Sequence, residues 1–173
     1  NTLFTINPQV NNTNSMLGNT FTWSGSYPSG LTGGAGSGTG SIVETLLNPT
    51  AGTLTATYTI VPTGSNGCVG SSFTITKDIT PQPAGVNSVE LAQCSNVSFT
   101  FDPQSNISNG QVSTFTWVRI LPTGLTEVVG GGGTGSGTIT ETLQNLTGGV
   151  LNAVYTVTPT GPLATSCVGS SFT

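Results

Sequence analysis

The chain has 173 residues, of which 2 are Lys or Arg and 6 are Asp or Glu, and it contains no histidine. Charged residues make up 5% of it, against roughly 25% in an average globular protein. The missing histidine excludes Ser-His and Cys-His catalytic pairs and the most common metal ligand, and two cations cannot form a surface that follows nucleic-acid phosphates. We therefore expect a folded, non-enzymatic protein with no catalytic residue, cofactor or metal, which binds no nucleic acid. With no run of roughly 18 apolar residues, we also expect no insertion into a membrane.

Alternating apolar and polar residues predict β-strands in both halves of the chain, because side chains in a strand point to opposite faces with a period of two. The alternation occurs, in chain order, at Phe4 and Ile6, Phe21 and Trp23, Leu54 to Ile60, Val97 to Phe101, Phe115 and Trp117, and Leu151 to Val157. Helical spacing appears nowhere, and Gly or Pro interrupts the chain about every 8–12 residues, as in sandwiches of short strands. The sequence therefore predicts an all-β, antiparallel fold.

The second half of the chain repeats the first. The triplet at 21–23 (Phe-Thr-Trp) recurs at 115–117, and the segment at 58–64 (Tyr-Thr-Ile-Val-Pro-Thr-Gly) returns in similar form at 155–161. The offset grows from 94 to 97 residues between these landmarks, so three residues have been inserted in the second copy. Such drift is typical of tandem domains, since loops tolerate insertions and cores do not.

We expect two domains, residues 1–83 and 84–173, joined by a short junction at 81–85. The first copy has no counterpart of the segment before Val97, and the second stops before a counterpart of residues 75–79. We therefore expect the first copy to be truncated at its N-terminus, the second at its C-terminus, and the chain to be a window from a longer tandem array.

Three cysteines are an odd number, and the repeat suggests how they pair. Cys68 and Cys167 are equivalent, whereas the counterpart of Cys94 would lie just before Asn1. We expect a Cys94–Cys167 disulfide in the second domain, and Cys68 paired with a cysteine upstream of Asn1. A Cys68–Cys94 link and unpaired thiols remain alternatives. A disulfide would place the protein in an oxidising, extracellular setting.

Glu44 and Glu141 are equivalent and lie inside alternating segments. Acid/base catalysis usually needs a second group near such a carboxylate, and each Glu stands alone in its copy. We therefore expect solvated positions, or positions bonded to the Thr-rich face. Trp23 and Trp117 could form a sugar-binding platform, but their alternating context favours the sandwich core.

Asp78, Glu90 and Asp102 flank the junction and could hold calcium there. Calcium takes six to eight oxygen ligands, usually from several carboxylates, and no Asp-x-Asp cluster is present, so we expect no metal site. An isopeptide crosslink would require Lys77, the only lysine, and we do not expect one.

The Gly-rich runs 33–40 and 130–137 are not followed by the Lys and helix that a phosphate loop needs. We expect both runs to be mobile loops or turns of a sandwich. Sequons predict surface positions at Asn11, Asn96, Asn106 and Asn145.

The order of these landmarks resembles the PKD-like, immunoglobulin-like repeats of very large surface proteins of Bacteroidota. The landmarks are a Cys-Ser start at Cys94, the Phe-Thr-Trp strand, a Gly/Ser-rich segment leading into Glu-Thr-Leu, the Tyr-Thr-Val-Thr-Pro-Thr strand, and a Cys-Val-Gly turn before Ser-Phe-Thr. The resemblance covers essentially the whole chain and implies two tandem immunoglobulin-like (PKD-like) β-sandwich domains. It also implies export through the type IX secretion system, often with a gliding-motility-associated domain elsewhere in the polypeptide, and a place on the bacterial cell surface.

Three functions fit these expectations. The chain is most simply a stalk or spacer segment of a large secreted adhesin, in contact with neighbouring repeats of the same polypeptide. Alternatively, it is a subunit of an extracellular filament or sheath, which self-associates because few Lys and Glu residues guard its strand edges. A second alternative is the accessory array of a secreted enzyme, which binds surface glycans.

Overall fold

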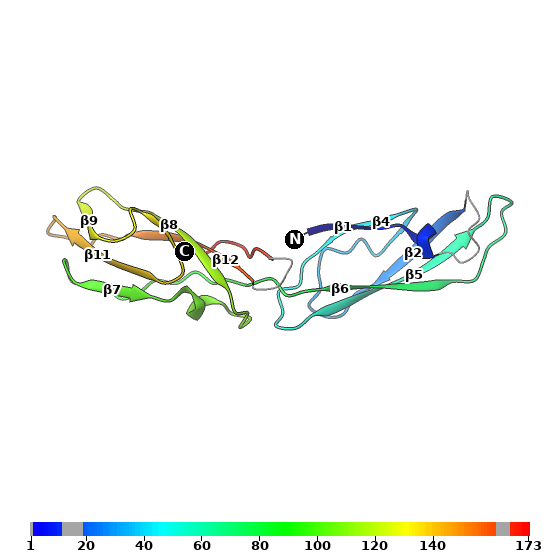
Figure 1. The fold of residues 1–173 in the computed structure, drawn as a ribbon, viewed down its shortest axis with the longest axis horizontal. Helices are drawn as coiled ribbons and strands as arrows, with labels where there is room; N and C mark the ends of the chain where they lie inside the picture. The colour runs from blue at the N-terminus through cyan, green and yellow to red at the C-terminus, as the bar shows by residue number, and fades with distance from the viewer. Residues whose placement is uncertain (1, 12–18, 162–166) are drawn as a thin grey trace. The chain divides into compact units, whose positions relative to one another are not determined.

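The computed structural model describes residues 2–11, 19–161 and 167–173 (Figure 1). The chain divides into two compact units, Asn1–Pro81 and Gln82–Thr173, each considered by itself below. All strand pairs of the described residues are antiparallel, and the helices among them are two short 3-10 turns. The prediction of an all-β chain with two tandem immunoglobulin-like sandwiches is confirmed. None of the described helices is both long enough and apolar enough to span a bilayer.

The first unit is a sandwich of a two-stranded and a four-stranded sheet. In sheet order the first is β1-β4 and the second β3-β2-β5-β6. The bounds are β1 Thr2–Ile6, β2 Thr20–Ser26, β3 Ser37–Thr39, β4 Ile42–Leu46, β5 Leu54–Thr63 and β6 Phe73–Ile79, with a 3-10 turn η1 at Pro8–Asn11.

The second unit repeats this plan with two three-stranded sheets, β7-β11-β9 and β10-β8-β12. The bounds are β7 Ser98–Phe101, β8 Thr114–Ile120, β9 Leu125–Val129, β10 Thr134–Ser136, β11 Ile139–Asn145 and β12 Val154–Thr160, with a 3-10 turn η2 at Pro103–Asn106. By the sequence repeat, β7, β8, β10, β11 and β12 correspond to β1, β2, β3, β4 and β5. Strand β9 ends in the three inserted residues 127–129, which explains why the first unit has no equivalent strand.

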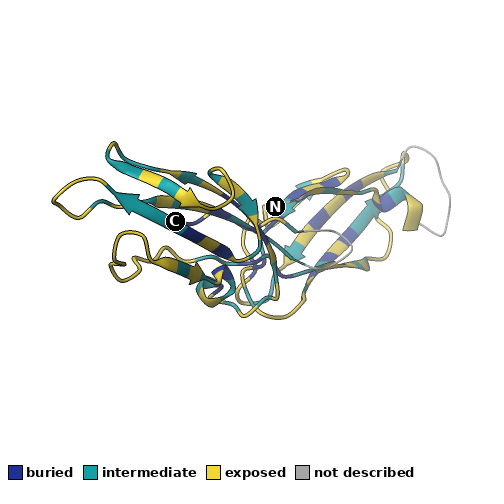
Figure 2. Cartoon of the chain, turned by 60° about the vertical axis from the view of Figure 1, so that its left-hand side comes forward, coloured by how far each residue is buried: buried dark blue, intermediate teal, exposed yellow. Residues whose placement is uncertain are grey.

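The alternation seen in the sequence sets which face of each strand enters the core. Strands β2 and β8 have the same burial pattern, in which Phe21, Trp23, Phe115 and Trp117 are buried between exposed threonines. Figure 2 shows the resulting alternation of buried and exposed residues along the strands. The first core contains Phe21, Trp23, Leu31, Ile42, Leu46, Ala56, Tyr58 and Ile60. The second contains Ile107, Phe115, Trp117, Ile139, Val157 and Phe172. The expectation that both tryptophans are core residues is therefore confirmed.

The Gly-rich runs are more ordered than the sequence indicated. The expectation of mobile loops is wrong for part of each run, because β3 pairs with β2 and β10 pairs with β8. At the centre of these strands, a Cβ on Gly38 would lie 2.5 Å from Trp23 Cζ2, and a Cβ on Gly135 would lie 2.3 Å from Trp117 Cζ2. Only glycine lets the backbone pass this close to the tryptophan ring.

Strand β12 is shorter than the sequence predicts. The alternation begins at Leu151, but β12 begins at Val154, whereas the equivalent strand of the first unit begins at Leu54. In the first unit β6 pairs with β5 along its length, from Leu54 opposite Ile79 to Ile60 opposite Phe73. No strand among the described residues pairs with residues 151–153 in this way.

Candidate functional site

Each unit contains one buried glutamate at an equivalent place in its sandwich. Glu44 on β4 is 4% exposed and Glu141 on β11 is 1% exposed. The expectation of a solvated position, or one bonded to the Thr-rich face, is therefore wrong for both. The sequence contained the correct signal: Glu44 lies two residues from Ile42 and two from Leu46, and residues at that spacing share one face of a strand. The apolar neighbours face the core, so the carboxylate does too.

In the first unit Glu44 accepts three hydrogen bonds. Its Oε2 accepts from Tyr58 Oη at 2.5 Å, and its Oε1 accepts from Tyr27 Oη at 2.7 Å and from the backbone N–H of Ala35 at 2.9 Å. The ring of Tyr58 also packs edge-on against Trp23 and Tyr27, with centroids 5.9 and 6.1 Å apart. Because a buried carboxylate is stable only when its oxygens are bonded, these three donors are what the site requires.

In the second unit an arginine takes the place of one tyrosine. Arg119 Nη1 donates to Glu141 Oε2 at 2.5 Å, and Nη2 donates to Glu127 Oε2 at 2.5 Å. Tyr155, the equivalent of Tyr58, donates to Glu141 Oε2 at 2.6 Å. The Arg119 and Glu141 side chains are 5% and 0% exposed, and that of Glu127 is 21% exposed. Glu141 is therefore not the lone carboxylate that the sequence suggested, because Glu127 shares its arginine.

The two units use different side chains to donate a hydrogen bond to the equivalent glutamate. Arg119 is equivalent to Gly25, and a Cβ on Gly25 would lie 2.2 Å from Tyr27 Oη, so Tyr27 fills the space that a side chain would need. In the second unit the equivalent of Tyr27 is Leu121, and Arg119 donates to the buried carboxylate instead. Glu127, which shares the arginine, comes from the three-residue insertion. The arginine at position 119 and the insertion that supplies Glu127 are therefore linked, because the two side chains are hydrogen-bonded to each other.

Glu141 accepts fewer hydrogen bonds than Glu44 among the described residues. The backbone N–H of Ala35 caps Glu44, but its equivalent, the N–H of Gly132, donates to Glu127 Oε1 at 3.1 Å. Among the described residues, Glu141 Oε1 and Arg119 Nε are buried without a hydrogen-bond partner. We expect the second network to depend more strongly on its charge pair, since a buried unpaired charge is costly.

Burial and the neighbouring carboxylates shift the pKa values of these groups. Burial, and then the hydrogen bond to Glu44, raise the pKa of Tyr58 and of Tyr27 above the ordinary 10.0. Burial and Glu141 do the same to the pKa of Tyr155. Burial lowers the pKa of Arg119, but its bonds to Glu127 and Glu141 outweigh this and raise it overall. The tyrosines therefore stay protonated donors at neutral pH.

Each network joins the two sheets of its sandwich. Glu44 lies on sheet β1-β4 and Tyr58 on the facing four-stranded sheet, while Glu141 lies on sheet β7-β11-β9 and Arg119 and Tyr155 on sheet β10-β8-β12. We call each set of contacts a cross-tie: Tyr27, Glu44 and Tyr58 in the first unit, and Arg119, Glu127, Glu141 and Tyr155 in the second. The geometry suits a structural connection through the core.

The acidic residues near the junction each have a local hydrogen-bond donor. Asp78 accepts from Thr55 Oγ1 at 2.6 Å, Glu90 from Ser88 Oγ at 3.2 Å, and Asp102 caps η2 by accepting from the N–H of Gln104 at 3.0 Å. Within the described ranges, no three His, Cys, Asp or Glu residues form a group that could hold a metal ion. The nitrogen of Lys77 lies 5.8 Å from the centre of the Phe4 ring.

The cysteines and the sequons are partly exposed. Cys68 and Cys94 are exposed and Cys167 is half-buried, and no disulfide joins these described thiols. The Cys94–Cys167 pairing stays a prediction. Of the sequon asparagines, Asn11 and Asn96 are exposed, while Asn106 and Asn145 are half-buried and donate through their side-chain amides to backbone carbonyls.

A comparison with known protein families agrees with the division of the chain into two units. The family model of the PKD-like domain matches the chain twice, over residues 3–83 and 91–173. Searches of curated proteins and of solved structures returned no match.

Proposed function

Because the chain belongs to the PKD-like domain family and carries the domain twice, we propose that it is a non-catalytic stalk or spacer segment of a large secreted bacterial cell-surface adhesin. The observation that carries the proposal is the tandem repetition of one sandwich, with equivalent tryptophans and an equivalent cross-tie in each copy. Repeating one domain adds length to a polypeptide without adding a new chemical site.

The internal location of the candidate residues supports this role. Glu44 and Glu141 are bound inside the cores, and the tryptophans that could have stacked on a sugar are buried with them. The proposal places the protein outside the cell, exported by a type IX secretion system. That part rests on the resemblance of the repeats to those of large Bacteroidota surface proteins.

The test is immunogold electron microscopy of intact source cells with an antibody raised against residues 1–173. We expect gold label outside the cell envelope, without permeabilising the cells, on thin projections that emerge from the surface. Label found only after permeabilisation would contradict the extracellular location, and label on laterally packed fibres would favour the filament alternative over a stalk.

A further inference from the structure

The first seven residues of the second unit, 82–88, form a segment that we call the strap. The strap belongs to no strand, and the second family match begins only after it, at residue 91. Its sequence, Gln-Pro-Ala-Gly with flanking polar residues, is typical of a linker. In the structure, however, Pro83 is buried and the strap is hydrogen-bonded along both of its sides.

On one side the strap lies antiparallel to the loop 106–109, which follows the start of η2. Gly85 and Ile107 form an antiparallel bridge, and the N–H of Val86 donates to Asn106 O at 2.9 Å. The strap is therefore fixed to a loop whose Ile107 is part of the second core.

Two asparagine side chains of this loop add further bonds to the strap. Asn109 accepts from the N–H of Ala84 at 3.2 Å and donates to Gln82 O at 2.8 Å. Asn106 donates to Val86 O at 2.9 Å. Hydrogen bonds to the loop therefore begin at the first residue of the strap.

On its other side the strap lies beside residues 168–173. The side-chain amide of Gln82 donates to Val168 O, and the N–H of Ser88 donates to Thr173 O at 2.9 Å. The first residue of the strap thus meets the first residue of this segment, and the last meets the last. The two segments therefore run in the same direction.

Between these two ends the strap is packed against a buried aromatic ring. A Cβ on Gly85 would overlap the ring of Phe172, which is 3% exposed. Phe172 also exchanges two backbone hydrogen bonds with Val157 of β12, at 2.8 and 2.9 Å. The strap is therefore connected through Phe172 to the sheet β10-β8-β12.

This arrangement decides how tension along the polypeptide acts on the strap. Tension from the first unit enters the second at Gln82, and tension in residues 168–173 pulls toward Thr173, however far the polypeptide continues. Because Gln82 lies beside Val168 and Ser88 beside Thr173, the two pulls act at opposite ends of the strap and along its length. A pull along a segment loads its hydrogen bonds together, so several must break in one event.

We propose that the strap is a mechanical clamp, whose bonds to residues 106–109 and 168–173 set the rate at which the second unit unfolds under tension. Breaking them is the first step of extension, before the strands of the two sheets separate. The clamp would serve the stalk function proposed above but does not depend on it, because the direction of loading follows from the connectivity of the chain.

The test is single-molecule force spectroscopy of the 1–173 chain, held by marker domains at its two ends. Asn109→Ala removes the bonds to Gln82 and Ala84, at the end of the strap where tension enters. At a fixed force this variant should unfold the second unit about tenfold faster, since two hydrogen bonds are lost before the rate-limiting step. The first unit serves as an internal control, and its unfolding rate should not change.

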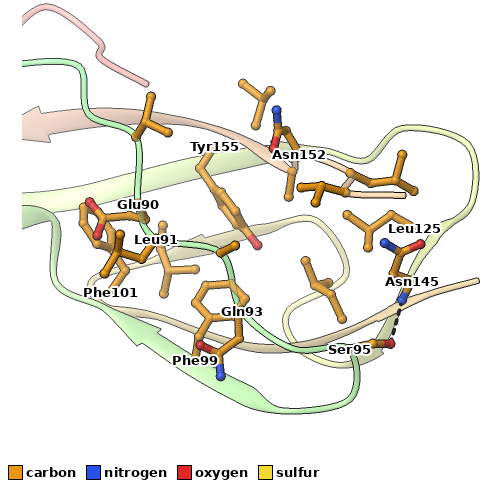
Figure 3. A pocket seen from close by; sticks show the side chains of 18 of the residues that line it. Glu90, Leu91, Gln93, Ser95, Phe99, Phe101, Leu125, Asn145, Asn152 and Tyr155 are labelled. Atoms are coloured by element: carbon orange, nitrogen blue, oxygen red, sulfur yellow. Dashed lines mark hydrogen bonds between the residues drawn. The ribbon is translucent and has the colours of Figure 1, made fainter. Parts of the chain in front are cut away.

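Asn145→Ala is the matched control in the second unit. Its side chain is also half-buried, but it accepts from the N–H of Thr147 at 2.8 Å and donates to Gly149 O at 2.7 Å, within its own turn. Figure 3 shows Asn145 beside Ser95, whose hydroxyl accepts from its backbone N–H. These bonds involve no strap residue. For the same loss of stability in urea denaturation, Asn145→Ala should therefore change the unfolding rate under force much less than Asn109→Ala.

A second pair of variants tests the contact with Phe172. Gly85→Ala puts a methyl group into the ring and should displace the strap, so the second unit should again unfold faster under force. Gly148→Ala is its control, because a Cβ there meets nothing within 4 Å, and it should leave the rate unchanged. Equal effects under force of Asn109→Ala and Asn145→Ala, or of Gly85→Ala and Gly148→Ala, would overturn the proposal.

Hydrogen exchange of the unaltered chain tests the strap without any variant. The amides of Val86 and Ser88, which donate to Asn106 O and Thr173 O, should be protected as strongly as the amide of Val157. The amide of Leu91, whose residue is 95% exposed, should exchange fast. Exchange of Val86 and Ser88 as fast as that of Leu91 would show that the strap is a free linker, and the clamp would be wrong.

Discussion

At the scale of single residues, the cross-ties explain how a protein with so few charged groups buries three of them. Arg119 and Glu141 lie in the core of the second unit and Glu44 in that of the first, and each is bonded by neighbours from the facing sheet. A buried ion pair need not add net stability, but removing one partner is costly. Loss of one partner should therefore destabilise the unit that contains it.

The tyrosines report directly on the cross-ties, because the chain has three of them and all three donate to the buried carboxylates. Their pKa values are raised in the folded state. A raised folded pKa gives stability that is complete below the unfolded value of about 10 and is lost as pH rises above it.

We therefore predict that the folded chain shows little tyrosinate absorbance at a pH slightly above 10, and that the tyrosines ionise together with unfolding at higher pH. Ultraviolet absorbance near 295 nm, recorded with circular dichroism across the titration, measures both events. Smooth ionisation near pH 10 of a chain that remains folded would contradict the buried hydrogen bonds.

Replacing Arg119 tests whether this residue takes the role in the second unit that Tyr27 has in the first. Arg119→Gly leaves Glu141 with Tyr155 as its partner and should lower the free energy of unfolding of the second unit by about 3–5 kcal/mol, as measured by urea denaturation. The double variant Arg119→Gly with Leu121→Tyr rebuilds the arrangement of the first unit and should recover part of that loss. A double variant no more stable than Arg119→Gly would show that the two positions are not equivalent.

At the scale of elements, the alternation of the sequence predicted the strands that form both cores, because inward-facing residues are apolar at every second position. Glu44 and Glu141 were misjudged although the same alternation placed them inward, since a charged residue was expected to face water. Glu127 was missed because its role depends on the inserted residues of β9, which have no counterpart in the first copy. The partners Tyr27 and Arg119 lie far from the glutamates in sequence and only the fold brings them together.

The short strands β3 and β10 were also missed, because glycine disfavours strands in general. Their glycines are needed for contact with the tryptophans. Gly38→Ala or Gly135→Ala should therefore lower the free energy of unfolding by about 1–3 kcal/mol through overpacking, measured by urea denaturation. Gly52→Ala is the control, since a Cβ there meets nothing within 4 Å, and its effect should be small. Equal effects at Gly38 and Gly52 would contradict the close packing on Trp23.

At the scale of the whole molecule, the repeat in the sequence predicted two sandwiches, and the fold and the family match bear that out. What a comparison of halves could not predict is how the cross-ties of the two copies differ. Tyr27 donates to Glu44 in the first unit, and Arg119 donates to Glu141 in the second. That difference depends on contacts across the core, and therefore on segments that are distant in sequence.

The proposed spacer role requires that each sandwich resists extension as a separate unit. Strands of one copy pair with strands of the same copy in every sheet of the described residues, so we expect the two units to unfold one at a time under force. Each family match covers about 80 residues, and an extended residue spans at most about 3.6 Å, so each event should release a little less than roughly 290 Å.

The most direct measurement is single-molecule force spectroscopy of the 1–173 chain held between well-characterised marker domains. We predict two separate unfolding steps of nearly this length, and a lower force for the second unit alone when Arg119→Gly removes its charge pair. A single step spanning both units, or extension without a force peak, would contradict the claim that this chain is a tandem of independently folded spacer domains.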